Sequence, residues 1–218
     1  MHPLVRAVAR PVVLNLNTPV ARRRTTRAIA AADGPIRLEI GGLEQRPGWL
    51  VTNVNAVTRN YLDASATWPL GPASVSVVYA DNVIEHLPLD AGRALFREAF
   101  RCLQPGGVIR LVTPDLRKHI EAYLAGPDSV CGDIAEAYRQ IGLRVDHPID
   151  LVRIPVENFR HHEGYVYDVA SLSAELTAAG FVDVRECAFG KSDVPDLDGL
   201  DKRLDEGPAQ MALEAVRP

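Results

Sequence analysis

The chain is poor in cysteine, in long apolar runs and, near its N-terminus, in acidic residues. Its 218 residues include three cysteines, at positions 102, 131 and 187. An odd number at wide spacing excludes a disulfide framework and a paired Cys-x-x-Cys zinc pattern. There is no run of about 18 apolar residues to span a membrane, and Arg6, Arg10 and Asn15 interrupt the apolar start, unlike a secretory signal. We therefore expect a cytoplasmic protein that does not enter a membrane.

Acidic residues are absent from residues 1–32, which carry six arginines. We expect this segment to be an N-terminal basic arm or cap, either a solvated helix or a dimer contact; acceptor binding, a phosphate contact and weak membrane association stay open. The whole chain has a formal charge of −4 and a pI near 5.9, which gives no general attraction to nucleic acid or membrane. A small neutral or cationic partner fits better, and a homodimer stays open.

The remainder, residues 33–218, reads as one domain in which strands and helices alternate. We expect strands at 36–40, 49–54, 75–80, 108–113, 181–187 and 210–216, and helices at 90–103 and 171–179. This pattern predicts a Rossmann-like α/β fold with a mostly parallel sheet, an antiparallel last strand and helices on both faces. Too few residues separate the first two strands for a full crossover helix. Residues 126–165 follow no regular pattern and are expected to be an insertion that binds the acceptor.

Several short motifs occur in a fixed order along this domain, at residues 38–42, 48–49, 63–64, 79–87, 103–107, 113–116 and 179–184. Through them, residues 36–217 resemble the class I S-adenosylmethionine-dependent methyltransferases, in the branch associated with bacterial glycan synthesis. The chain is also similar, more narrowly, to mycobacterial sugar O-methyltransferases of methylmannose polysaccharide synthesis. The resemblance implies S-adenosylmethionine as cofactor and the hydroxyl group of a small carbohydrate as methyl acceptor.

The turn after the first strand is the first expected part of the cofactor site. Gly41 and Gly42 let the backbone approach the methionyl part of the cofactor, although the family's second glycine position holds Leu43 here. Glu39 matches the acidic residue near the cofactor's ammonium group, or forms a salt bridge at the strand end. At the end of the second strand the family has a carboxylate for the ribose hydroxyls, but this chain has Asn53 and Asn55. Neutral amides bind a diol less strongly than a carboxylate.

Asp63 and Ala64 match the family's adenine-binding position, where a carboxylate accepts from the amino group and the next N–H meets the ring. The alternative for Asp63 is a turn or helix N-cap. Asp81 and Asn82 follow the central strand and are expected near the cofactor's sulfonium end.

A metal site is also predicted, from Asp81, Glu85 and His86. Asp81 and Glu85 are four residues apart, so in a helical turn they share a face, with His86 beside them. Some family members with Glu-His here bind a divalent metal, and two carboxylates suit Mg²⁺ better than zinc. Alternatively, Glu85 and His86 hold the loop in place by hydrogen bonds and no metal is needed.

A histidine is suited to take a hydroxyl proton, because its unperturbed pKa is about 6.5. The stretch from Arg160 to Asp168 resembles the family's histidine-containing stretch, with an offset of about one residue. We therefore expect His162, narrowly preferred over His161, or His86 to be the base, with Glu85 completing the catalytic group. The alternative is that adjacent loop histidines face solvent or are structural.

Three other functions remain open at this stage. The basic N-terminal arm alone supports a nucleic-acid methyltransferase, but no interleaved aromatic residues accompany it. Leu43, Asn53 and Asn55 support a catalytically silent binding module of the same fold. A dinucleotide-dependent oxidoreductase is disfavoured, because the second glycine, the first crossover helix and the ribose acid are missing.

Overall fold

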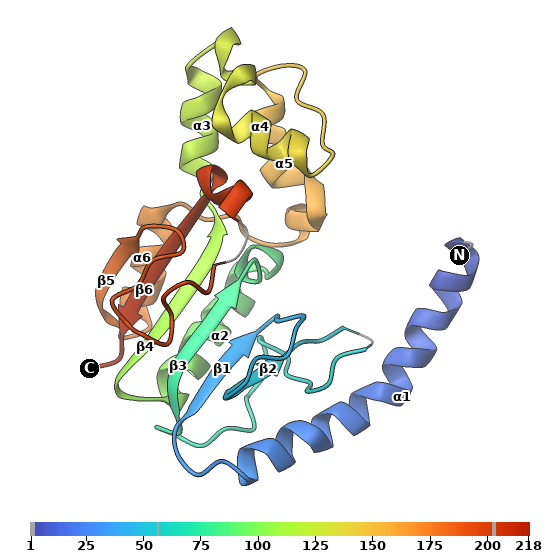
Figure 1. The fold of residues 1–218 in the computed structure, drawn as a ribbon, viewed down its shortest axis with the longest axis vertical. Coiled ribbons are helices and arrows are strands. Elements are labelled where there is room, and N and C mark those ends of the chain that lie inside the picture. Colours follow the sequence, from blue (N-terminus) through green and yellow to red (C-terminus); the bar gives the residue numbers. More distant parts are fainter. Residues whose placement is uncertain (1–2, 56, 202–203) are drawn as a thin grey trace.

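The fold is built on one six-stranded sheet. A computed structural model describes residues 3–55, 57–201 and 204–218 (Figure 1). The strand order is β2-β1-β3-β4-β6-β5, in which neighbours from β2 to β4 run parallel and β6 runs antiparallel to both β4 and β5. The strands are β1 (Ile36–Ile40), β2 (Trp49–Thr52), β3 (Val75–Asp81), β4 (Leu103–Pro114), β5 (Val182–Cys187) and β6 (Gln210–Val216). This topology confirms the predicted fold class, and residues 41–48 join β1 to β2 without a helix, as expected.

Strand β4 begins earlier than the sequence predicts. Helix α2 (Leu89–Cys102) passes directly into β4 at Leu103, five residues before the expected start of the strand. The pairing of β3 with β4 shifts register between Val75, opposite Leu103, and Val77, opposite Val108. Residues Pro105, Gly106 and Gly107 therefore form an irregularity within β4 and do not interrupt the strand.

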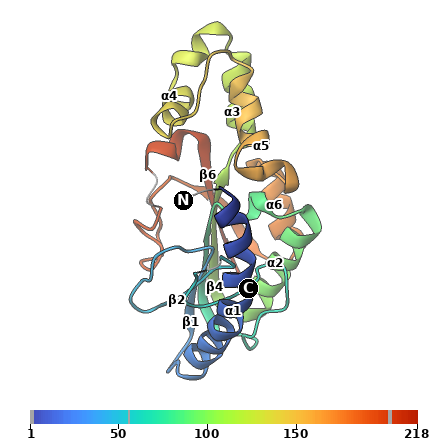
Figure 2. The ribbon, with the colours of Figure 1, turned by 90° about the vertical axis from the view of Figure 1, so that its right-hand side faces the viewer.

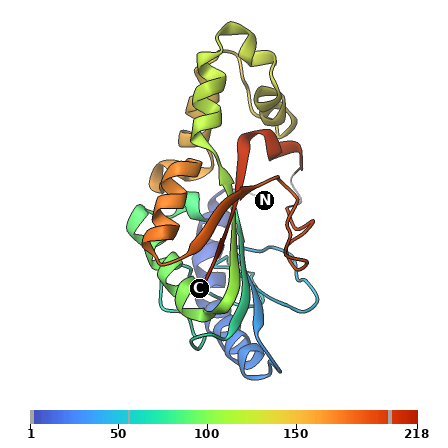
Figure 3. The ribbon, with the colours of Figure 1, turned by 90° about the vertical axis from the view of Figure 1, so that its left-hand side faces the viewer.

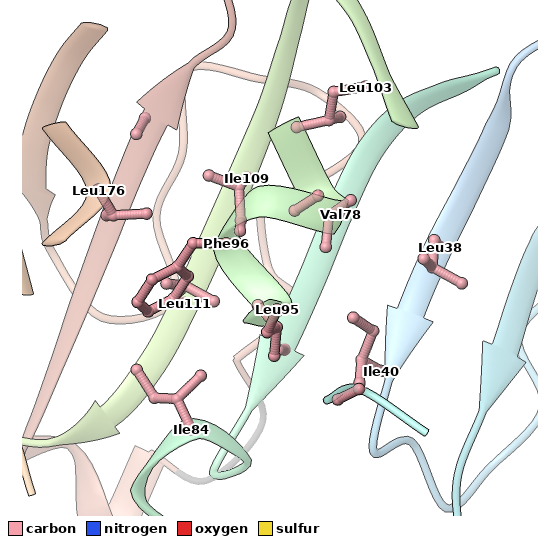
Figure 4. Packing of buried hydrophobic residues seen from close by; sticks show 14 of the residues in the cluster. Leu38, Ile40, Val78, Ile84, Leu95, Phe96, Leu103, Ile109, Leu111 and Leu176 are labelled. Carbon is pink, nitrogen blue, oxygen red and sulfur yellow. The ribbon is translucent and has the colours of Figure 1, made fainter. Parts of the chain in front are cut away.

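One face of the sheet is covered by helices α2 and α6 (Val169–Ala178). Side chains of β1, β3 and β4 pack there against Leu95 and Phe96 of α2 and Leu176 of α6, all of them fully buried (Figure 4). Burial of each such side chain contributes about 1.5 to 3 kcal/mol. This layer is the main hydrophobic core.

The other face is covered by the irregular segment 188–201, as the two nearly edge-on views show (Figures 2 and 3). Leu197 and Leu200 pack on Val77 and Val112 of the sheet. No helix occurs in this segment. Its turns supply the apolar cover that a helix would otherwise provide.

A buried ionic network fixes that segment to the sheet. Arg110 of β4 donates through two nitrogens to Asp201, and its Nη1 lies 2.7 Å from Oε1 of Glu214 on β6. The Tyr79 hydroxyl donates to Asp201 at 3.2 Å. Burial lowers the pKa of Arg110, but its bonds to the two carboxylates outweigh burial and raise it. The network therefore keeps its charges in the core.

The segment expected to be irregular contains two α-helices, α4 (Asp133–Gln140) and α5 (Asp150–Glu157). Together with α3 (Leu116–Leu124), they stand beyond the carboxyl ends of β3 and β4 (Figure 1). Tyr138, Leu151 and Ile154 belong to a separate small core between them. Short 3₁₀ helices link the parts: η1 (Ile84–His86), η2 (Pro127–Cys131), η3 (Asn158–Glu163) and η4 (Leu204–Ala209). Short helices around Pro and Gly give too little periodicity for sequence detection.

Most of the basic arm is one helix, α1 (Pro3–Ala30). Ala21 and Thr25 are buried and Ile29 is half-buried, so one narrow stripe of its second half contacts the domain. The Thr25 hydroxyl lies 3.0 Å from the carbonyl oxygen of Tyr61. The first half of α1 points away from the sheet (Figure 1). Among the described residues, no helix combines the length and apolar character that a membrane crossing requires.

Candidate active site

Two connected hollows lie at the carboxyl ends of β1 and β3. The larger, here called the main cleft, has a volume of about 980 Å³, and the smaller, the side cavity, about 440 Å³. Ile40, Gly41, Asn82 and His86 line both. Ligands of open α/β sheets bind at this end of the strands.

Gly41 is required by the geometry of this edge. Its φ is +79°, a left-handed conformation that glycine adopts without strain. A Cβ atom built on it would come within 2.4 Å of Cγ2 of Val83. The first strand therefore ends in a left-handed glycine turn that packs against Val83 and lines both hollows.

Glu39 also faces the main cleft, beside Gly42. It is buried, and its Oε2 accepts from Nε of Arg46 at 3.2 Å. The arrangement satisfies the salt-bridge alternative and still leaves Glu39 in the cleft wall. Arg46, which holds the carboxylate, was not singled out in the sequence.

The two asparagines after β2 serve the local backbone. Nδ2 of Asn53 donates to the carbonyl oxygens of Gly41 and Gly42, at 2.7 and 3.2 Å, and its Oδ1 accepts from the N–H of Val54 and Asn55. Asn53 lines the side cavity, whereas Asn55 lines neither hollow and its Oδ1 accepts from Val57. Asn53 thus holds the glycine loop, a structural role that the sequence reading did not include.

Asp63 and Ala64 line the side cavity together. Oδ1 of Asp63 accepts from both the N–H and the hydroxyl of Ser65, at 3.0 and 2.7 Å. The turn alternative for Asp63 is therefore realised, while its position beside Asn53 keeps it at the edge expected for adenine.

Asp81 and Asn82 lie in the wall of the main cleft at the end of β3. The Tyr79 hydroxyl, which lies 3.2 Å from Asp201, is also 3.3 Å from Oδ2 of Asp81, so the buried ionic network reaches the cleft. Asn82 has a φ of +50°, a conformation that asparagine tolerates better than most residues. The backbone turns sharply there and leads into η1.

Three side chains converge beside this turn: Glu85, His86 and His161. One ligand atom of each lies within 4.8 Å of the others, which we call the Glu-His-His cluster. Glu85 is fully buried, and the Thr113 hydroxyl donates to its Oε2 at 3.1 Å. The rings of His86 and His161 meet edge to face with centroids 4.8 Å apart. Asp81, expected to join Glu85 and His86, is not in this group.

His161 has a defined protonation. Its Nδ1 lies 2.8 Å from the carbonyl oxygen of Pro155, and because a carbonyl only accepts, Nδ1 carries the hydrogen. The lone pair of the neutral ring is then on Nε2. Burial lowers the pKa of His161 and outweighs the opposing effect of that hydrogen bond. The ring is therefore neutral near pH 7 and able to take a proton or bind a metal.

The expected base, His162, is placed elsewhere. Its side chain is 56% exposed, lies 3.9 Å from Glu163 and lines neither hollow, whereas His161 is 4% exposed and lines the main cleft. Adjacent residues of a 3₁₀ turn point in different directions, so only one of them faces the site. The sequence predicted His162 narrowly over His161, but His161 is the one that faces the main cleft.

A close backbone contact brings η3 to η1. A Cβ on Gly164 would come within 2.0 Å of the carbonyl oxygen of Glu85. No other residue type fits at this distance, so Gly164 allows the end of the insertion to pack on η1. This contact between η3 and η1 places His161 close to Glu85.

The far wall of the main cleft comes from the insertion. Ala137, Tyr138 and Ile141 of the α4 region line it, and the Tyr138 hydroxyl lies 2.6 Å from Nε2 of His119. His119 is fully buried, and burial lowers its pKa to about 4. The neutral ring accepts from Tyr138 and holds it at the cleft.

Comparison with known proteins agrees with this geometry. Residues 29–111 match a family model described as a methyltransferase domain. Over these residues the chain is similar to a methyltransferase domain. This match and the motifs after β1, β3 and α2 indicate S-adenosylmethionine as the cofactor. No match is found among curated proteins.

Solved structures similar to this chain include three that are much longer. The CurJ carbon methyltransferase is 13% identical, with a TM-score of 0.49 over 88% of this chain and 51% of that one. The Haemonchus contortus phosphoethanolamine N-methyltransferase 2 is 15% identical, with a TM-score of 0.47 over 94% and 52%. The S-adenosylmethionine-dependent methyltransferase SibL is 17% identical, with a TM-score of 0.47 over 94% and 55%. The chain spans about half the length of each.

Proposed function

We propose that the methyltransferase domain transfers the methyl group to a hydroxyl oxygen of a small acceptor, with a carbohydrate as the acceptor class. The Glu-His-His cluster carries this proposal, because it sets a neutral imidazole and a buried carboxylate beside the cofactor end of the main cleft. A hydroxyl, unlike a neutral amine, gains from a group that removes its proton during transfer. The carbohydrate class rests on the resemblance of the sequence motifs.

The cofactor residues are proposed from their places around the two hollows. Bound S-adenosylmethionine supplies a methyl group already activated by its sulfonium. Gly41 and Glu39 would hold its methionyl end in the main cleft, and Asp63 and Ala64 its adenine end in the side cavity. Asn53 lines the side cavity and would contribute indirectly, by holding the glycine loop through its hydrogen bond to Gly41. Gly41 lines both hollows, so its backbone is available to a ligand that spans them.

The proton of the acceptor is proposed to go to Nε2 of His161. As the new O–C bond forms and the S–C bond breaks, the hydroxyl loses its proton to this lone pair, which the bond to Pro155 fixes in direction. Glu85, whose exposed fraction is zero, stabilises the imidazolium that results. His86 borders the acceptor from the solvent side.

The same cluster also fits a divalent cation. Histidine ligands of metals donate their other ring N–H to a carbonyl, as His161 does to Pro155. A cation held by Glu85, His86 and His161 would acidify a bound hydroxyl. Two imidazoles and one carboxylate suit Mn²⁺ or Zn²⁺ better than the Mg²⁺ expected from the sequence.

We expect a metal test on the cluster to show binding independently of activity. Protein stripped with EDTA should gain about 5 °C in Tm at a saturating Mn²⁺ or Zn²⁺ concentration, and less with Mg²⁺. Glu85→Gln should abolish this gain, whereas Asp81→Asn, outside the cluster, should keep it. Full turnover after chelation, with no metal-dependent Tm shift, would reject the metal and leave His161 as the base.

The function itself is tested by product analysis. The protein is incubated with labelled S-adenosylmethionine and panels of sugars, small phenols and small amines, and products are identified by mass spectrometry. We expect methyl ethers of sugars. Methylated amines instead would contradict hydroxyl transfer, and methylated phenols alone would retain hydroxyl transfer but remove the carbohydrate class. Calorimetry with S-adenosylmethionine, run in parallel, separates a wrong acceptor from a domain that does not bind its cofactor.

A further inference from the structure

A third hollow, the arginine cavity, lies at the amino ends of β1 and β2, away from the active site. Its volume is about 580 Å³, within the range of small-molecule sites. Arg24 and Arg27 of α1, Arg37 of β1 and Arg59 line it, with Gln45, Trp49 and Asn60 among the other lining residues. Nothing in methyl transfer uses this collection of cations.

The charges around the arginine cavity are incompletely balanced. Arg37 lies 3.2 Å from Asp196, and Asp33 is the one acidic residue among those that line the cavity. In the portion of the chain covered by the structure, Arg24, Arg27 and Arg59 form no ion pair and are exposed. Two carboxylates therefore face four guanidinium groups. Arg27 also lies in the last turn of α1, where a cation is favoured by the helix dipole, so one of the four has a structural reason to be there.

The distribution of charge along the chain adds to this local excess of positive charge. Residues 1–32 carry six arginines and no acidic residue, whereas 18 of the 24 basic residues and all 28 acidic residues lie beyond them. A strongly basic element is thus docked on an acidic domain, but at the arginine cavity its cations converge with Arg37 and Arg59 instead of meeting carboxylates. Guanidinium groups bind phosphate oxygens in a bidentate manner, and several together select a phosphorylated ligand.

We propose that the arginine cavity binds the phosphate or pyrophosphate group of a small molecule. The four arginines hold the anion, and the volume of the cavity exceeds that of a bare phosphate, leaving room for an organic part against the Trp49 ring. The guanidinium of Arg46 lies 5.6 Å from the centre of that ring and keeps it in place. Gln45 lines both this cavity and the main cleft, so the loop 41–48 separates the two ligands.

The test is isothermal titration of the full chain with sodium pyrophosphate at low salt. Arg24→Gln and Arg59→Gln should each weaken binding by about tenfold, the size expected for one charge-assisted contact. The matched control is Arg23→Gln, which removes the same charge from the neighbouring position of α1 but does not line the cavity. Its affinity should equal that of the unaltered protein.

Three results would overturn the proposal. The first is no binding of pyrophosphate by the unaltered protein. The second is an equal loss in Arg23→Gln and Arg24→Gln, which would mean diffuse attraction to α1. The third is tight binding of a short single-stranded RNA that weakens equally in all three variants, which would mean a nucleic-acid surface. None of these measurements involves methyl transfer, so the result is independent of the proposed function.

Discussion

Replacing His161 by alanine is expected to lower the rate of methyl transfer by about 10²-fold to 10⁴-fold, the range of a positioned acid–base group. The ring is buried, its tautomer is fixed by Pro155, and His161 belongs to the Glu-His-His cluster. Affinity for S-adenosylmethionine should change by no more than about twofold, because the residues proposed to hold the cofactor are elsewhere. Single-turnover rates and calorimetry measure the two quantities separately.

The neighbouring residue supplies the control. His162→Ala alters the same 3₁₀ turn but removes an exposed side chain outside both hollows, so its rate should stay close to that of the unaltered enzyme. Equal losses in both variants would point to a damaged turn instead of a lost base. Unchanged turnover in His161→Ala would remove the proposed role of His161 as the base.

The largest loss of stability is expected from Arg110→Met. The substitution leaves Asp201 and Glu214 buried without their cation, and breaking a buried ion pair costs about 3 to 5 kcal/mol. Although Arg185 also contacts Glu214, at 2.9 Å, the bonds of Asp201 to the guanidinium have no substitute of equal charge. The free energy of unfolding, measured with urea, should fall by this amount.

A surface arginine tests whether charge removal alone explains the effect. Arg117→Met breaks an exposed pair with Glu121, four residues along α3, and should change the free energy of unfolding by less than about 1 kcal/mol. If Arg110→Met were equally mild, the segment 188–201 would be held to the sheet by its apolar contacts, such as those of Leu197, and not by the ionic network.

The fold was largely predictable because its signals are local. The apolar runs of β1 and β3 and the helical spacing of α2 fix the element types, and the short 41–48 connection excludes a crossover helix. The cover of the second sheet face was not predictable, since segment 188–201 has no periodicity and depends on Arg110, about 90 residues away in sequence. The same holds for the buried position of His119, set by Tyr138 on another helix.

The candidate site was predicted in part for the same reason. Gly41 and the Glu85-His86 pair follow strands directly, so their place at the carboxyl edge could be read from order alone. The choice between His161 and His162 could not, because it depends on how η3 is turned by Pro155 and packed through Gly164. Asn53 was identified by position, but its bonds to the glycine loop are visible only in three dimensions.

Gly164 packs against Glu85, so the Glu-His-His cluster is held independently of the opposite wall of the main cleft. The cluster sits on η1 and η3, whose backbones touch, whereas the wall opposite belongs to α4, which has its own small core with α5. Sequence changes at Ala137 or Ile141 are therefore expected to remodel the shape that the main cleft offers to the proposed acceptor without moving His161. A library of variants at those two positions should change the range of acceptors while leaving the Glu-His-His cluster unchanged.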